Sequence, residues 1–236
     1  MALHGMAFLP IWHDVAAEAE QEFNQWHTEE HMPERVATPG IAVGRRYANA
    51  SLDLHRYFTL YEADSFDVFA SDGYFATANA RSAWTRRMHP HFLNFVRNPC
   101  HLVMTRGRGI GGALATVRVI LQTAVVKHPA LGAITGRDAY GLAVRDIVDT
   151  LMQIKEITAV HAGATGQVQR RPLSESSLSL RPNAMAFDGV LLLESIDLAT
   201  LEACLPRVQA VLQQHLSSFA RWEQAAYQLA FHLSDS

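Results

Sequence analysis

The 236-residue sequence predicts an α+β protein in which two halves of similar size repeat one order of elements. Strand-like and helix-like segments alternate as βαββαβ in each half. The glycine-rich stretch RGRGIGGA (106–113) separates the two series and is typical of a linker. A chain of this length suits two packed halves of about 110 residues each. We therefore expect halves spanning 1–107 and 113–236, packed face to face as an intramolecular α+β barrel.

The first half alternates strands and helices. We predict strands over 5–13, 41–50, 55–63 and 100–106, with helices over 15–31, from 66 onward and over 79–96. Pro33 and the Pro39-Gly40 pair should end the first helix, because proline removes a backbone donor and clashes inside a helix. Ser65 is placed to cap the helix that begins at Phe66.

The second half repeats this order. We predict strands over 113–125, 157–168, 187–195 and 223–233, with helices over 137–154 and from Asp197 to about 216. The segments LYEADSFDVF (60–69) and LLESIDLATL (192–201) align without gaps, each being a strand that ends in Glu before a capping residue and a helix. The polar segment 169–183 is predicted as a long loop. Two ferredoxin-like βαββαβ halves result.

Composition excludes several classes of function. Hydrophobic residues make up 49% and charged residues 18% of the chain, which is enough to bury a core. A net charge of −3 gives no strong field for nucleic acid, and no apolar run predicts a membrane span or a signal peptide. Cys100 and Cys204 alone do not make a disulfide scaffold or a cysteine zinc site. We expect a cytoplasmic protein whose partner is a small molecule.

The most unusual polar residues follow Phe23. On a helical projection Glu30 falls near the apolar face marked by Phe23 and Trp26, where a carboxylate must be paired, hydrogen-bonded or protonated. His27 and His31 lie one turn apart and share a flank of the helix. Because histidine titrates near working pH, His27, Glu30 and His31 are candidates for acid–base chemistry in a pocket.

Two other interpretations of this helix stay open. Glu30 can form a structural ion pair with Arg35, Arg45 or Arg46, since structural networks also hold buried carboxylates. Alternatively, Arg45, Arg46 and the adjacent Tyr47 can hold an acidic group of a substrate.

The run HTEEH (27–31) also fits the H-x-x-E-H pattern of inverzincin metalloproteases. The pattern is short and easily met by chance, Pro33 follows within two residues, and no third ligand is evident. We therefore expect no bound metal.

A second candidate segment is SAWTRRMHPH (82–91). Trp84 can wall an aromatic pocket and the adjacent arginines can bind an anion, although an amphipathic helix with a buried Trp84 explains the pattern as well. Tyr57 begins a predicted strand and enters the pocket if that strand lines it. The second half has no counterpart of these segments, and His161 is predicted as a core or wall residue, so this half is expected to be mainly structural.

The run F-N-x-W-H-x-E-E-H-M-P-E-R, followed by PGI, GRRY, YFTLYE and WTRRM, resembles EthD-like proteins of the dimeric α+β barrel superfamily. The resemblance covers about residues 5–105 and implies that His31 faces the barrel pocket, with His27 beside it. Relatives include cofactor-independent monooxygenases, muconolactone-type isomerases, polyketide cyclases and some haem enzymes. Most have one ferredoxin-like unit and dimerise, whereas this chain resembles two fused units, so a monomer or a homodimer is expected.

Residues and resemblance together predict a cofactor-independent enzyme of the lyase, isomerase or cyclase type that acts on an aromatic or cyclic carbonyl compound by acid–base catalysis. In this interpretation His31 or His27 moves the proton, Glu30 tunes the histidine, and Arg45 or Arg46 binds an oxyanion. Trp26, Tyr47, Tyr57 and Trp84 are the further candidates for substrate binding. A cofactor-independent monooxygenase acting on a phenol and a non-catalytic ligand-binding or stress module are the alternatives. Haem and zinc are minority possibilities.

Overall fold

The computed structural model describes residues 3–122, 126–128, 130–166 and 187–235. The predicted loop at 169–183 lies outside these ranges. The chain divides into two compact units. The N-terminal unit comprises His4–His101, Gly166 and residues 229–235, and the C-terminal unit comprises Leu3, Leu102–Thr165 and Phe187–Gln228. The chain passes between the units inside strands β5 (Cys100–Gly107) and β11 (Ala220–Ser234), so the last residues belong with the first half.

The sheet of the N-terminal unit has the ferredoxin-like strand order. Its strands are β1 (Ala7–Val15), β2 (Ile41–Ala48), β3 (Tyr57–Ala63) and β4 (Phe92–Arg97). They pair antiparallel in the order β2-β3-β1-β4. Because β1 and β3 are central, alternate residues of these two strands point toward the helices, which positions the site described below.

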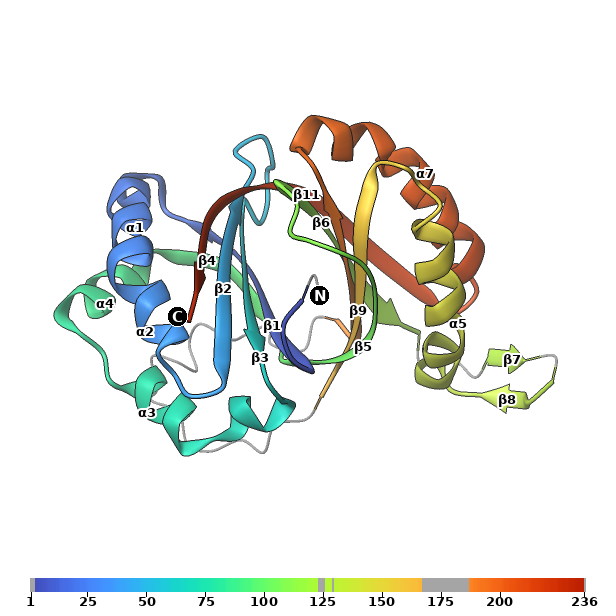
Figure 1. Cartoon of the computed structure of the whole chain (residues 1–236), viewed down its shortest axis with the longest axis horizontal. Helices are drawn as coiled ribbons and strands as arrows, with labels where there is room; N and C mark the ends of the chain where they lie inside the picture. Colours follow the sequence, from blue (N-terminus) through green and yellow to red (C-terminus); the bar gives the residue numbers. More distant parts are fainter. Residues whose placement is uncertain (1–2, 123–125, 129, 167–186, 236) are drawn as a thin grey trace. The chain divides into compact units, whose positions relative to one another are not determined.

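One continuous helical segment follows β1. It consists of α1 (Glu20–Trp26), a π-helical turn (His27–His31) and α2 (Met32–Val36). The Met32 N–H donates to the His27 carbonyl five residues earlier, which defines the wide turn. The prediction that Pro33 ends the helix is wrong, because the wide turn places proline in the first turn of α2, where its missing N–H is tolerated. Figure 1 shows these helices, with α3 (Asp72–Asn79) and α4 (Ala83–Met88), on one side of β1–β4.

The helix predicted over 79–96 is also wrong in its second part. Helix α4 ends at Met88, a 3-10 turn covers His89–His91, and Phe92–Arg97 form β4 beside β1. Pro90 interrupts the helix, and the edge of β1 then offers backbone partners to the residues that follow. Ser65 makes no capping hydrogen bond, whereas Ser71 caps α3.

The C-terminal unit is a second ferredoxin-like unit. Its strands β6 (Ala113–Leu121), β9 (Ile157–Thr165) and β10 (Gly189–Ser195) lie in the order β11-β6-β10-β9. Helices α5 (Gly136–Leu151) and α7 (Leu198–Leu216) lie side by side, and strands β7 (Val126–His128) and β8 (Gly132–Ile134) form a small hairpin (Figure 1). Asp197 caps α7 by accepting from the Thr200 N–H at 2.8 Å, as predicted.

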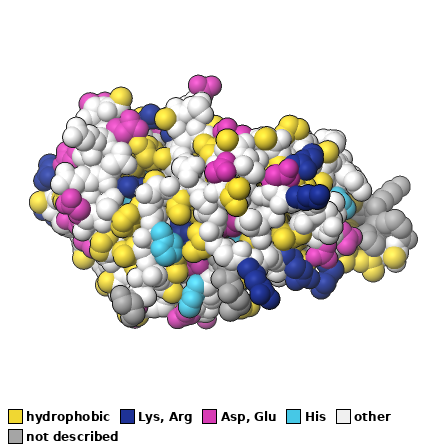
Figure 2. Space-filling view, turned by 45° about the horizontal axis from the view of Figure 1, so that its top comes forward, with side chains coloured by type: hydrophobic (Ala, Val, Ile, Leu, Met, Phe, Trp, Pro, Cys, Tyr) yellow, Lys and Arg dark blue, Asp and Glu magenta, His cyan; other side chains and the backbone are white. Residues whose placement is uncertain are grey.

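The two-unit ferredoxin-like α+β architecture is therefore confirmed, and the packing of the units into one barrel stays a prediction. In the C-terminal unit, buried aliphatic residues fill the space between α5, α7 and the sheet. On the face drawn in Figure 2, acidic and basic side chains are interspersed, which agrees with the small net charge. None of the helices that the structure describes is long and apolar enough to span a bilayer.

Candidate active site

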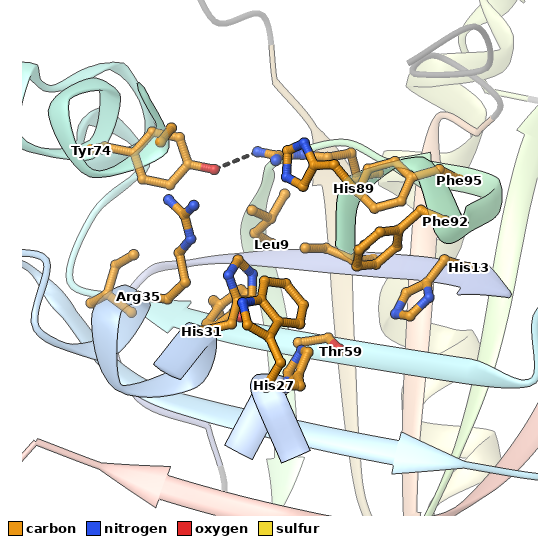
Figure 3. A pocket seen from close by; sticks show the side chains of 16 residues that line it. Leu9, His13, His27, His31, Arg35, Thr59, Tyr74, His89, Phe92 and Phe95 are labelled. Carbon is orange, nitrogen blue, oxygen red and sulfur yellow. Dashed lines mark hydrogen bonds between the residues drawn. The ribbon is translucent and has the colours of Figure 1, made fainter. Parts of the chain in front are cut away.

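A cavity of about 80 Å³ lies within the N-terminal unit, and every residue that lines it belongs to this unit (Figure 3). Its apolar walls are made by Leu9, Ile11, Trp26, Ile41, Ala78, Phe92 and Phe95. Its polar lining consists of His13, His27, His31, Arg35, Thr59, Tyr61, Tyr74, His89 and Arg97. The lining thus combines aromatic surface with imidazole, guanidinium and hydroxyl groups.

Strand periodicity explains the floor of the cavity. Leu9, Ile11 and His13 are alternate residues of β1, and Thr59 and Tyr61 are alternate residues of β3. In an antiparallel sheet such residues project from one face, so both central strands contribute to the same surface.

Strand β4 departs from this alternation. Phe92, Phe95 and Arg97 all line the cavity, although Phe92 and Phe95 are three residues apart. Between them Asn94 has a positive φ of 51°, and the pairing of β4 with β1 shifts register at this point. This irregularity is a β-bulge, which turns both aromatic rings toward the cavity.

The helical segment supplies the imidazoles closest to one another. His27 and His31 are four residues apart across the π-helical turn, and their ring centroids lie 5.3 Å apart. The indole of Trp26 stacks on the His31 imidazole, with centroids 4.4 Å apart. Arg35 follows one turn later on α2. π-Helical turns of this kind occur often at functional sites.

The environment of the cavity keeps its histidines neutral. Burial lowers the pKa of His13 to about 4 and that of His89 to about 4. Burial also holds the pKa values of His27 and His31 well below 6.5, and the nearby guanidinium of Arg35 adds to this effect at His31. At neutral pH each ring therefore has one nitrogen lone pair available to accept a proton or to bind a metal.

Several buried polar atoms around the cavity lack hydrogen-bond partners among the residues that the structure describes. They are His27 Nδ1, His31 Nδ1, His89 Nδ1, Thr59 Oγ1 and the Tyr61 hydroxyl. Buried polar groups are nearly always satisfied, and such a group left unpaired costs about 1–3 kcal/mol. Their concentration around one cavity indicates a site that is completed by a ligand or by water.

Glu30 is not among the residues that line this cavity. Its Oε1 accepts hydrogen bonds from Trp26 Nε1 at 3.0 Å, Ser82 Oγ at 2.5 Å and Thr85 Oγ1 at 3.0 Å. The carboxylate therefore joins the π-helical turn to α4. We predicted that Glu30 contacts and tunes a catalytic histidine. Instead, its Oε1 accepts hydrogen bonds from three other side chains, and Glu30 does not line the cavity. Glu30 can therefore affect the histidines only through Trp26 and α4.

Arg45 and Arg46 also lie outside the cavity. Arg45 is fully buried and forms an ion pair with Glu62, on the face of the sheet opposite to Thr59. Arg46 projects toward the helices, where it donates to the Asn24 carbonyl at 3.1 Å and to Thr28 Oγ1 at 3.0 Å. Strand alternation sends Arg45 to the face away from the cavity, and contacts with Asn24 and Thr28 engage Arg46, so neither arginine lines this cavity.

Four other predicted residues have structural contacts. Tyr47 lies beside Arg45, whose guanidinium donates to its hydroxyl at 3.4 Å. Tyr57 donates to Glu20, and Trp84 packs against the core beneath α1 and α4. His161, in the C-terminal unit, contacts Thr105 Oγ1 at 2.7 Å. Of the predicted binding aromatics, Trp26 lines the cavity.

Sequence reasoning missed His13, Arg97, Tyr74 and Phe95 as lining residues and considered Arg35 only as an ion-pair partner. The alternation Leu9, Ile11, His13 on the first strand was the available signal for His13. No comparable signal marked Arg97, because its segment was predicted as a helix.

Among the described residues, no third protein ligand for a zinc ion lies with His27 and His31. In the described part of the chain, no group of three or more His, Cys, Asp or Glu side chains is placed to hold a metal ion. Glu30 bonds to α4 rather than pointing into the cavity between His27 and His31. The absence of zinc stays a prediction.

No family model and no curated protein matches the sequence. Solved structures share its fold at low identity. A candidate monooxygenase from Fusobacterium nucleatum is 11% identical with a TM-score of 0.57, over 98% of this chain and 96% of that one. An anthrone oxidase-like protein is 10% identical with a TM-score of 0.61, over 97% of this chain and 92% of that one. A haem-binding protein from Thermus thermophilus is 9% identical with a TM-score of 0.51, over 97% of this chain and 92% of that one.

These similarities establish the ferredoxin-like fold over both units. They also correct one expectation. The sequence led us to expect no cofactor, but a structure with the same fold over nearly the whole chain is a haem-binding protein. The same fold therefore also occurs in a haem-binding protein, and the expectation of a cofactor-free site is withdrawn.

Proposed function

We propose that the cavity of the N-terminal unit is the active site of an enzyme that removes a proton from a small aromatic or cyclic carbonyl compound. The observation that carries this proposal is the pair of neutral histidines, His27 and His31, whose Nδ1 atoms have no partner among the described residues and which line an aromatic cavity. A neutral imidazole within reach of an acidic O–H or C–H bond is a general base.

The remaining lining groups suit the anion that this step creates. Loss of the proton leaves a phenolate or an enolate, and the Arg35 guanidinium and the Tyr61 hydroxyl both line the same cavity. Positive charge and hydroxyl donors in a water-poor site stabilise a developing oxyanion. The aromatic rings of Trp26 and Phe92 offer flat surfaces to the ring of the substrate.

We propose an oxygenase outcome for this intermediate. A carbanion flanked by a ring carbonyl reacts with dioxygen, so that a CH₂ group and O₂ give a C=O group and water. The names of two structures with this fold, a candidate monooxygenase and an anthrone oxidase-like protein, support this choice over isomerisation, in which the proton returns to another carbon. The sequence motif also supports placing the N-terminal unit among the EthD-like proteins.

The cavity must open to admit such a compound. Its volume of about 80 Å³ is below the range of roughly 300–1,000 Å³ that is usual for ligand sites. Arg35, His89 and Arg97 are only partly buried, so movement of these side chains widens the entrance.

A haem-dependent enzyme is the second candidate function, because histidines and arginines line the same cavity. If haem binds here, His27 or His31 would hold the iron and Arg35 and Arg97 would pair with the two propionate carboxylates, after the cavity widens well beyond its present volume of about 80 Å³. When bound, haem supplies a redox-active iron for oxygen chemistry. Titration of the purified chain with haemin, followed by the Soret absorbance, tests this candidate. A stoichiometric band that is lost in His27→Ala or His31→Ala supports it, and an unchanged spectrum rejects it.

Oxygen uptake tests the proposed reaction. Phenols and anthrones of one to three rings are supplied to the full chain, and dioxygen consumption and products are measured together. His31→Ala and His27→Ala should lower turnover by about 10²-fold or more, the usual scale for loss of a general base. The exposed His232→Ala serves as the matched control. Wild-type turnover in both cavity variants rejects the proposal, and a rearranged product without oxygen uptake replaces oxygenation by isomerisation.

A further inference from the structure

The lining of the cavity is unbalanced in charge. It contains two arginines, Arg35 and Arg97, and no aspartate or glutamate. Arginines elsewhere in the chain, such as Arg45 and Arg56, form ion pairs with buried or partly buried carboxylates. A pocket with two guanidiniums and no carboxylate attracts anions, because apolar walls weaken solvent screening of the charge.

Arg97 is held in place by a tyrosine rather than by an acid. Its guanidinium donates to the hydroxyl of Tyr74 and lies 6.0 Å from the centroid of the same ring. The contact fixes the direction of the guanidinium while leaving its charge unneutralised, and no ion pair of Arg97 occurs within the described ranges.

The Arg35 guanidinium forms neither a hydrogen bond nor an ion pair with any residue that the structure describes. Its helix is nevertheless fixed, because α2 packs so closely on β2 that a Cβ atom at Gly44 would lie 2.1 Å from Met32 Sδ. Burial is the main cause of the lowered pKa values of His31 and His89, and the charge of Arg35 lowers both pKa values further, as expected for a guanidinium near these two rings. Figure 3 shows Arg35, Tyr74 and His89 around the end of the cavity next to His31.

We infer that the substrate of this cavity is an aromatic carboxylate, with its carboxylate held between Arg35 and Arg97 and its ring against Trp26, Phe92 and Phe95. The inference rests on the proposed function for the role of the cavity and adds the chemical class of the ligand. It assigns Arg35 to the carboxylate and leaves the Tyr61 hydroxyl as the donor to the developing oxyanion. Guanidinium matches a carboxylate with two parallel hydrogen bonds, and two arginines supply enough donors for all four lone-pair directions.

Equilibrium binding to the full-length chain tests the inference without turnover. Benzoate, benzamide and phenyl phosphate are compared by calorimetry. Benzoate should bind at least tenfold more tightly than benzamide, because the amide has the same shape but no charge. Arg35→Gln and Arg97→Gln should each weaken benzoate about tenfold and change benzamide less than twofold. Arg86→Gln, an exposed arginine of α4 outside the cavity, should change neither.

Arg97→Lys guards against misfolding of the Arg97→Gln variant, since it keeps the charge and should retain part of the preference for benzoate. Equal affinity for benzoate and benzamide, or benzoate affinity unaffected by both arginine variants, overturns the inference. Tighter binding of phenyl phosphate than of benzoate overturns the carboxylate assignment. Benzoate binding in a chain that consumes no dioxygen leaves the inference standing and counts against the proposed reaction alone.

Discussion

The indole of Trp26 stacks on the imidazole of His31 at 4.4 Å between centroids, with 26° between the planes. The same indole donates its N–H to Glu30 Oε1 at 3.0 Å. Glu30 is anchored in turn by Ser82 and Thr85 of the α4 region. The orientation of the His31 ring therefore depends on a carboxylate that does not touch it, and Glu30 is a positioning residue.

Replacing Glu30 should chiefly affect stability. We expect Glu30→Gln to lower the free energy of unfolding by about 1–2 kcal/mol, because three hydrogen bonds to a charged acceptor become weaker. Turnover of the folded fraction should change far less than in His31→Ala. Glu29→Gln is the control, since Glu29 is exposed and its carboxylate accepts from Gln25 Nε2 on the surface of the same helix. A 10²-fold loss of turnover at unchanged melting temperature would instead restore Glu30 as a catalytic residue.

Two tyrosines of β3 should respond differently to removal of the hydroxyl. Tyr57 donates to Glu20 at 2.5 Å, so Tyr57→Phe should cost about 1–2 kcal/mol of stability. The Tyr61 hydroxyl is buried without a partner in the described structure, so Tyr61→Phe should leave stability unchanged or raise it. Chemical denaturation of both variants checks the contrast. A destabilised Tyr61→Phe protein would show that the hydroxyl is satisfied in solution.

Stability should fall on acidification through His13. Its pKa is about 4 in the folded chain and 6.5 when exposed, so between these values the unfolded chain binds a proton that the folded chain does not. The free energy of unfolding should therefore decrease as pH falls from 6.5 to about 4, by on the order of 3 kcal/mol for this group. His13→Phe should flatten the dependence in that window, whereas the exposed His232→Gln should not. Identical pH profiles for His13→Phe and the wild type would contradict the assignment.

The buried ion pair of Arg45 and Glu62 should be sensitive to loss of one partner. Each side chain is only 1% exposed. Arg45→Met should destabilise the chain by about 3–5 kcal/mol, because it leaves the Glu62 carboxylate buried without its counter-charge. The double variant Arg45→Met with Glu62→Leu should recover most of that loss. Additive effects in this double-mutant cycle would show that the two side chains do not interact.

Local signals in the sequence were sufficient for most of the order of elements, but not for strand β4 or the β7–β8 hairpin. The strand–cap–helix pattern around Asp197 predicted α7 and its capping hydrogen bond. Prediction was wrong where long-range pairing decides the structure. Phe92 and Phe95 have helical spacing, yet pairing with β1 makes their segment a strand, and the bulge at Asn94 turns both rings to one side.

The candidate site was predictable to a similar degree. Helical spacing located His27, His31 and Trp26 on one side of a helix, and all three line the cavity. The prediction that Arg45 and Arg46 line the site was wrong. Adjacent residues of a strand face opposite ways, so only Arg46 faces the helices. There Arg46 donates hydrogen bonds to Asn24 and Thr28. No local pattern reveals that Arg35 and Arg97, 62 positions apart in the chain, border one opening.

The π-helical turn at His27–His31 acts as an angular offset between two helical segments. It contains one residue more than an α-helical turn, so the residues after it are rotated by about 100° relative to an uninterrupted α-helix. Deleting the exposed Glu29 would remove the extra residue, so the turn would close in regular α-helical phase and α2 would keep its orientation. The undeleted residues in an uninterrupted α-helix would instead turn Arg35 by about 100° away from its present direction relative to His27. The register of a single backbone hydrogen bond therefore determines whether base and guanidinium belong to one site.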